Sequence, residues 1–98
     1  MTWEVVASKT LLKQLEHLDI KYKKQIDKKI DLIKANPFRF KTIHSNLYSR
    51  VFRVRLGIAG KETRLIYVVF GTKIILACLL DWIKEYEDLE NYLARLET

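Results

Sequence analysis

The sequence contains few of the residues that build disulfide or metal frameworks. Its 98 residues include one cysteine and two histidines. A single thiol, Cys78, cannot form an internal disulfide, so a reducing compartment is the simpler expectation. His17 and His44 lack the spacing of a zinc site, and we predict no metal site. No glycine-rich loop leads from a strand into a helix, so we predict no cofactor.

Long hydrophobic runs are also lacking. The longest, Ile74 to Leu80, is seven residues, whereas a membrane-spanning helix needs roughly 20. The first residues carry no basic segment that leads into an apolar stretch, so we expect no signal peptide. Hydrophobic residues nevertheless make up 49% of the chain, which is enough for a core. We therefore expect one cytoplasmic domain over residues 1–98, without a membrane partner.

The positive charge is concentrated in the middle of the chain. The formal net charge is +6, and residues 50–73 hold six Lys/Arg against one Asp/Glu, whereas residues 74–98 hold two against six. A positive surface attracts phosphate groups and nucleic acid. Charge alone is equally compatible with a basic protein that binds no nucleic acid.

The first half of the chain is typical of a strand followed by two helices. Residues 3–7 alternate as a strand does. Ser8 is placed to cap a helix with leucines at helical spacing. A second apolar stripe runs from Tyr22 to Ile33, and Asn36-Pro37 ends it because proline disfavours a helical residue before it. The two helices should form a hairpin with one apolar face to bury.

The second half is typical of a sheet. Residues 40–43 are a strand or an extended segment. Clearer strands follow at 51–56, 64–70 and 74–80, with a predicted hairpin loop at Gly57–Lys61. The last of these strands is apolar throughout, as in a strand buried on both faces. Tyr86, Leu89, Leu93 and Leu96 indicate a C-terminal helix.

The predicted fold class is therefore α+β. An N-terminal strand and a helix hairpin pack on a small antiparallel sheet, and a C-terminal helix follows. The helices are expected to cover one face of the sheet and to leave the other partly open.

The residues most suited to chemistry lie on the predicted strands. Arg53 and Arg55 project from one face because they are two residues apart in a strand, and Arg64 begins the next strand. A hairpin can bring these three guanidiniums onto one concave surface, where they could bind phosphate and stabilise its developing charge. Two alternatives are that these arginines form an ordinary exposed strand face or pair with a partner's acids. From the residues alone, these alternatives together have about the same weight as phosphate binding.

At Phe52-Arg53-Val54-Arg55-Leu56 and Thr63-Arg64-Leu65-Ile66-Tyr67 the sequence resembles the RelE/ParE toxin family, in its RelE-like branch of type II toxin–antitoxin systems. The order of elements agrees over nearly the whole chain. The resemblance implies the RelE-like microbial RNase fold and a toxin held inactive by a cognate antitoxin. RelE-like members enter the ribosomal A site and cut messenger RNA without a metal, through attack of the 2′-hydroxyl on the adjacent phosphate.

Carried onto this chain, the resemblance assigns roles to individual residues. Arg53 and Arg55 match two basic strand residues, one linked to the general base and one to the phosphate. Arg64 matches the arginine that stabilises the transition state, and Tyr67 a strand tyrosine that packs. Lysine is commoner at the first two positions, and arginine is a poor proton acceptor because its pKa exceeds about 12. Counted from Tyr67 without gaps, a further basic residue falls on Lys84. The base-stacking tyrosine of the family falls on Glu90, so Tyr86 or Tyr92 would have to take its place.

The implied partners are the ribosome with its messenger RNA and a RelB-like antitoxin, acidic and partly disordered when free. This antitoxin should wrap the domain and cover the arginines or displace the C-terminal helix. Three other functions remain open: a ParE-like inhibitor of DNA gyrase, an inactive toxin-fold binding module, and an RNA-binding module without catalysis. The candidate RNA- and ribosome-binding residues are Lys21, Lys24, Lys28, Arg50 and Lys61.

Overall fold

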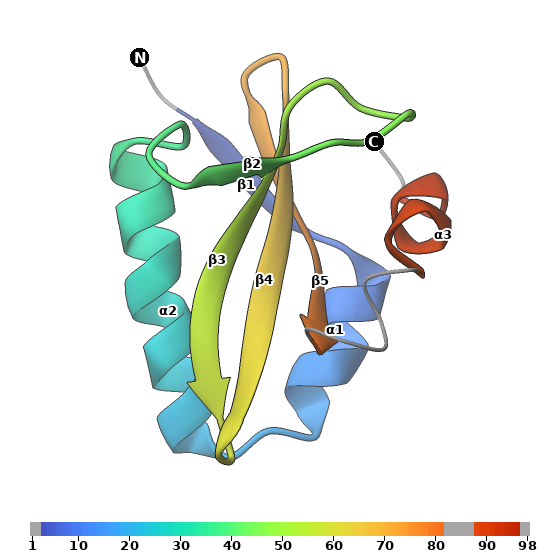
Figure 1. Cartoon of the computed structure of the whole chain (residues 1–98). Helices are drawn as coiled ribbons and strands as arrows, with labels where there is room; N and C mark the ends of the chain where they lie inside the picture. The colour runs from blue at the N-terminus through green and yellow to red at the C-terminus, as the bar shows by residue number, and fades with distance from the viewer. Residues whose placement is uncertain (1–2, 82–87, 97–98) are drawn as a thin grey trace.

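The structure is a computed structural model, and it describes residues 3–81 and 88–96. Within these ranges, five strands form a single sheet and three helices pack against it (Figure 1). In chain order they are β1 (Glu4–Ala7), α1 (Lys9–Glu16), α2 (Ile20–Ala35), β2 (Lys41–Ile43), β3 (Val51–Ile58), β4 (Lys61–Phe70), β5 (Lys73–Asp81) and α3 (Leu89–Ala94). The predicted α+β class and the predicted order of elements are confirmed.

Helix α1 begins, and helix α2 ends, where the sequence predicts. The Ser8 hydroxyl accepts a hydrogen bond from the Leu11 amide, 3.0 Å away, and so caps α1. The same hydroxyl donates to the carbonyl of Ala77, which ties the start of α1 to β5. Helix α2 begins after Asp19 and ends at Asn36, immediately before Pro37. The Ser8 cap thus fixes the start of α1 against the sheet.

The sheet is mixed rather than wholly antiparallel. Its strand order is β1-β5-β4-β3-β2. Strands β2 to β5 pair antiparallel, but β1 pairs parallel with β5, with Glu4 opposite Lys73. The predicted antiparallel sheet therefore has one parallel edge. Parallel pairing needs a long crossover between the two strands, and all the elements from α1 to β4 supply it here.

The β3–β4 hairpin is longer than the sequence predicts. The expected loop at Gly57–Lys61 contracts to two residues, Ala59 and Gly60, because the pairing continues to Ile58 opposite Lys61. Both turn residues have positive φ, 52° and 77° respectively. Two-residue turns of this kind match the twist of the strands they join.

The two faces of the sheet carry separate cores. Helices α1 and α2 cover one face through Leu11, Ile26 and Ile33. On the opposite face, Leu89 and Leu93 of α3 pack against buried residues of β3, β4 and β5. The face expected to stay partly open is therefore partly covered by α3. No helix in the described ranges is long and apolar enough to cross a membrane.

The turn gives a stability prediction. Ala59 is held at a φ that costs an alanine about 1 kcal/mol or more, whereas Asn tolerates it and Asn-Gly is a preferred pair for such turns. We expect Ala59→Asn to raise the free energy of unfolding in urea by about 0.5–1 kcal/mol. Gly60→Ala is the matched control, and it should lower stability. A neutral or destabilising Ala59→Asn variant would contradict the described turn.

Candidate functional site

The three strand arginines lie on one face of the sheet. Arg53 and Arg55 alternate with buried residues along β3, as the sequence predicts. The register of β3 against β4 places Arg55 directly opposite Arg64. Directly opposed residues project to the same side of a sheet. Pairing of these strands therefore gathers the arginines on the face that α3 partly covers. The sequence alone could not establish this arrangement because it does not give the register.

A carboxylate joins two of these arginines. Oε1 of Glu62 lies 2.9 Å from Nη1 of Arg64 and 3.1 Å from Nε of Arg55. The two guanidiniums differ greatly in setting, because the Arg64 side chain is 1% exposed and the Arg55 side chain 76%. Arg64 is thus part of the protein interior rather than of an open concave surface. One carboxylate oxygen therefore contacts one buried and one exposed guanidinium.

The arginines control the ionisation of Glu62. The hydrogen bond from Arg64 lowers the pKa of the Glu62 carboxyl, and the charges of Arg64, Arg55 and Arg53 lower it further. Glu62 is therefore an anion at neutral pH. The carboxylate offsets the like charges of Arg55 and Arg64, which would otherwise repel across the two strands.

Sequence reasoning missed Glu62, although two signals were present. It is the one acidic residue within 50–73. It also precedes Arg64 by two positions in a strand, so both side chains project from the same face. An acid placed in this way inside a basic hairpin is a candidate partner for the arginines.

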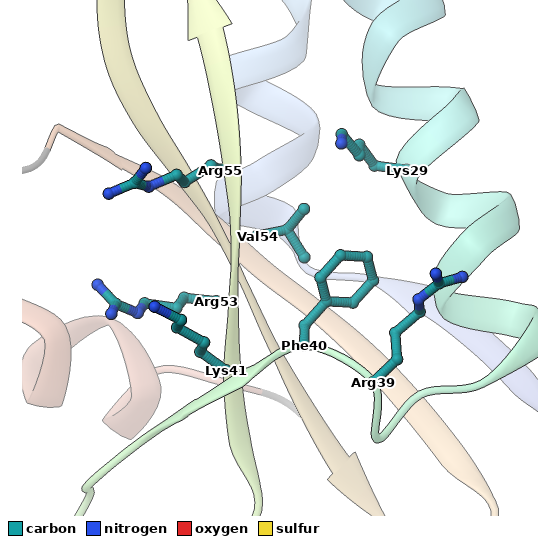
Figure 2. A pocket seen from close by; sticks show the side chains of 7 residues that line it. All are labelled: Lys29, Arg39, Phe40, Lys41, Arg53, Val54 and Arg55. Carbon is teal, nitrogen blue, oxygen red and sulfur yellow. The ribbon is translucent and has the colours of Figure 1, made fainter.

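A second feature is a pocket of about 310 Å³ at the edge of the sheet, between α2 and β3 (Figure 2). We call it the edge pocket. Five cationic side chains and two apolar ones line it, and none of the described residues that line it is acidic. Arg53 and Arg55 line this pocket and also belong, with Arg64, to the group of arginines on the α3 side of the sheet, which we call the arginine face. The lining residues are Lys29 of α2, Arg39, Phe40 and Lys41 at β2, and Arg53, Val54 and Arg55 of β3.

Three of the five cationic residues that line the edge pocket, Lys29, Arg39 and Lys41, were not among the predicted site residues. Lys29 falls three residues after Ile26 and four before Ile33, so it borders the buried stripe of α2. Lys41 lies directly opposite Arg53 in the β2–β3 pair. Arg39 places its guanidinium over the Phe40 ring, 5.6 Å from the centroid. The helical spacing of Lys29 was a readable signal, but the pairing of the short strand β2 was not.

The predicted RNA-binding residues do not form one group. Lys21, Lys24 and Lys28 are exposed along α2. Arg50 precedes β3 and stacks on the Phe38 ring, 5.5 Å from its centroid, whereas Lys61 lies at the turn end of the hairpin. An eight-residue strand separates these two by roughly 26 Å, so they cannot contact the same phosphate.

The structure describes only some of the residues expected near the C-terminus and on the last strands. Lys84 and Tyr86 lie outside the described residues. Tyr92, the alternative stacking residue, is half-buried beside the core under α3. Tyr67 is buried, its hydroxyl donates to the Pro37 carbonyl at 2.7 Å, and burial raises its pKa. It packs in the core that α1 and α2 cover, as a structural side chain does.

Comparison with known proteins bears on the fold. No protein-family model and no curated protein matches the chain. A solved structure of the E. coli toxin RelE, as a double arginine-to-alanine mutant in the free state, aligns with a TM-score of 0.74. The alignment covers 98% of this chain and 100% of that one at 15% sequence identity. The chain has the RelE fold. The fold expected from the strand motifs is confirmed, although few residues are identical to those of RelE.

The Glu62 contacts predict a pH dependence. Because folding lowers the pKa of Glu62 below its usual value of 4.5, its carboxylate stabilises the folded chain above the unfolded pKa. This contribution is lost as the pH falls through the folded pKa. The stability gap between the wild type and Glu62→Gln should therefore narrow from pH 7 toward pH 3 in urea denaturation.

An NMR titration of the Glu62 side-chain carboxyl carbon measures the same effect directly. Arg55→Gln removes one of the charges that lower the pKa and should shift the midpoint upward. A midpoint at or above 4.5 in the wild type would refute the described contacts.

Proposed function

We propose that this chain is the toxin of a type II toxin–antitoxin system and cleaves messenger RNA at A-site codons of the ribosome, in the cytoplasm. The RelE fold supports the toxin assignment, because the similar solved structure is a toxin. The observation that carries the proposal is the carboxylate oxygen of Glu62 between Arg55 and Arg64. Two guanidiniums that converge on one anionic oxygen can equally receive a phosphate oxygen.

A phosphate would bind here by replacing Glu62. Guanidiniums pair with phosphate through charge-assisted hydrogen bonds and keep their charge at physiological pH. Arg64 is held by burial, so its charge does not have to reorganise when a ligand arrives. Arg55 is exposed and can follow the ligand. Glu62 is 47% exposed and can rotate into solvent when a phosphate displaces it.

The proposed reaction is an intramolecular phosphoryl transfer within the RNA strand. The 2′-oxygen attacks the phosphorus and the bond to the 5′-oxygen breaks. The 2′-hydroxyl proton passes to solvent, and solvent returns a proton to the leaving oxygen. The guanidiniums stabilise the charge that develops on the phosphorane, with Arg64 at the buried side and Arg53 and Arg55 at the open side. Arginines do not serve as proton acceptors, so this site acts through electrostatic stabilisation.

The proposal includes an antitoxin as the second partner. Strand β2 pairs with β3 only as far as Arg53, so the rest of β3 forms the sheet edge in the described part of the chain. A strand edge beside cationic side chains favours an acidic segment that becomes ordered on binding. Such a segment would cover Arg53 and Arg55 and so block access of RNA.

The test is primer extension on a translated messenger RNA with purified ribosomes. Arg55→Ala is the first variant because Arg55 is exposed and its loss should leave the fold intact. Removing one group that stabilises transition-state charge typically costs about 10²–10³ in rate, and we expect a loss of about this size. Arg64→Ala should lose at least as much, provided that circular dichroism shows it is folded.

The control is Lys13→Ala, which removes an exposed cation from α1 and should leave cleavage unchanged. Ribosome-dependent cuts at A-site codons that weaken with Arg55→Ala and not with Lys13→Ala support the proposal. Equal cleavage by all variants, or no cleavage by the wild type, overturns it in favour of gyrase inhibition or an inactive toxin fold.

A further inference from the structure

The position proposed for the RNA phosphate holds a carboxylate in the free chain. Oε1 of Glu62 lies 3.1 Å from Nε of Arg55 and 2.9 Å from Nη1 of Arg64. Guanidiniums pair with carboxylate and with phosphate oxygens through the same N–H groups. A phosphate oxygen that takes these two donors must therefore break both contacts of Glu62.

Glu62 lies beside the two arginines but is not fixed on them. It precedes Arg64 by two positions in β4, so both side chains project from the same face of the sheet. The Glu62 side chain is 47% exposed, whereas that of Arg64 is 1% exposed. Solvent therefore reaches the carboxylate, and Glu62 can leave the arginines by rotation of its side chain while Arg64 stays in place.

The opposite strand leaves room for this rotation. Gly57 lies directly opposite Glu62 in the β3–β4 pair, and directly opposed residues project to the same side of a sheet. A Cβ at Gly57 would meet no atom within 4 Å in the described part of the chain. A shallow hollow of about 430 Å³ is lined in part by Gly57, Lys61 and Glu62. The turn end of the hairpin thus offers the Glu62 carboxylate a second position, with Lys61 beside it.

We propose that Glu62 is an internal competitor of the RNA phosphate, with a closed position on Arg55 and Arg64 and an open position over Gly57. The inference rests on the proposed function for the identity of the incoming anion. A carboxylate of the same chain competes at an effective concentration that dilution does not change. The closed position therefore lowers the apparent affinity for RNA by the fraction of molecules that are closed.

The first test is fluorescence anisotropy with a labelled six-nucleotide RNA in which every 2′-hydroxyl is methylated, so that binding is measured without cleavage. Glu62→Gln removes the competing charge and keeps the size of the side chain, and it should tighten binding about three- to tenfold.

The control is Glu4→Gln, which removes an equal charge from an exposed ion pair with Lys73. Strand β1 carries Glu4 and is separated from β4 by β5. This variant should change the RNA affinity by less than about twofold, because solvent screens distant surface charges. Equal gains in Glu62→Gln and Glu4→Gln would reflect net charge alone and would overturn the competitor.

A double-mutant cycle tests whether the gain arises at the arginines. In the wild type, Arg55→Gln removes a phosphate contact and also a contact that holds Glu62 closed, so part of the loss is offset. Arg55→Gln should therefore weaken RNA binding more in the Glu62→Gln background than in the wild type. Equal losses in the two backgrounds would contradict competition between Glu62 and phosphate.

Gly57→Val tests the open position without a change of charge. Gly57 lies within β3 and is not among the positive-φ glycines, so its backbone accepts a β-branched residue. The valine fills the space over which Glu62 moves, and it should weaken RNA binding about two- to threefold in the wild type and leave Glu62→Gln unaffected. A loss of the same size in both backgrounds would mean that the valine blocks RNA directly, and the open position would be wrong.

A second variant at position 62 covers a loss of stability. Glu62 also offsets the charges of Arg55 and Arg64, so circular dichroism must first show that Glu62→Gln is folded. Glu62→Asp keeps the charge but is shorter by one methylene, so its carboxylate cannot reach both arginines as closely. It should tighten RNA binding by less than Glu62→Gln does, and binding weaker than that of the wild type would contradict the competitor.

These outcomes separate the competitor from the cleavage reaction. If Glu62→Gln binds RNA as the wild type does while Arg55→Ala lowers cleavage on ribosomes, the competitor is wrong and the proposed function stands. If Glu62→Gln binds RNA more tightly through Arg55 while the wild type cuts no messenger RNA on ribosomes, the competitor stands and the proposed function is wrong.

Discussion

The two-residue turn at Ala59 and Gly60 sets the register of β3 against β4, and the arginine face depends on that register. With this turn, Arg55 lies opposite Arg64, and Glu62 reaches both guanidiniums. A slip of one residue would send one strand's side chains to the other face of the sheet. Arg64 would then enter the core under α1 and α2, and Glu62 would no longer contact Arg55. The positive φ of both turn residues is the local constraint from which the site follows.

The two cores explain why the charged groups can be both fixed and accessible. The core under α1 and α2 anchors one face of the sheet along its length. Leu89 and Leu93 of α3 build a second core on the other face. The arginines share that second face, where Arg64 is buried and Arg55 reaches solvent. A buried charge beside an exposed one allows the proposed phosphate to bind without a change in strand pairing.

The sequence predicted the parts of this arrangement that depend on local pattern. Alternation placed Arg53 and Arg55 on one face, and capping by Ser8 and the Asn36-Pro37 break marked helix ends that the structure confirms. The features that depend on pairing between distant segments could not be predicted from the sequence. The parallel β1–β5 edge and the pairing of Lys41 with Arg53 come from packing of the whole chain. Strand β2 has three residues, too few to show the alternation of polar and apolar side chains that identifies a strand.

Glu62 was overlooked for a different reason. A lone acid in a basic segment is usually solvated, so the charge count alone gave it no role. Only the register reveals that its carboxylate lies between two arginines. The roles expected of Lys84 and Tyr86 concern residues outside the described ranges and remain predictions. The likeness to RelE at 15% identity supports the fold, and the chemistry therefore depends on the arginine face itself.

The most direct test of the arginine face as a phosphate site is an NMR titration of the side-chain Nε–Hε groups with a cleavage-resistant RNA trinucleotide. If phosphate replaces Glu62, the signals of Arg55 and Arg64 and the carboxyl carbon of Glu62 will move together, with one affinity. If RNA shifts other arginines while these three groups stay unchanged at saturation, the arginine face does not bind RNA phosphate and the account is wrong.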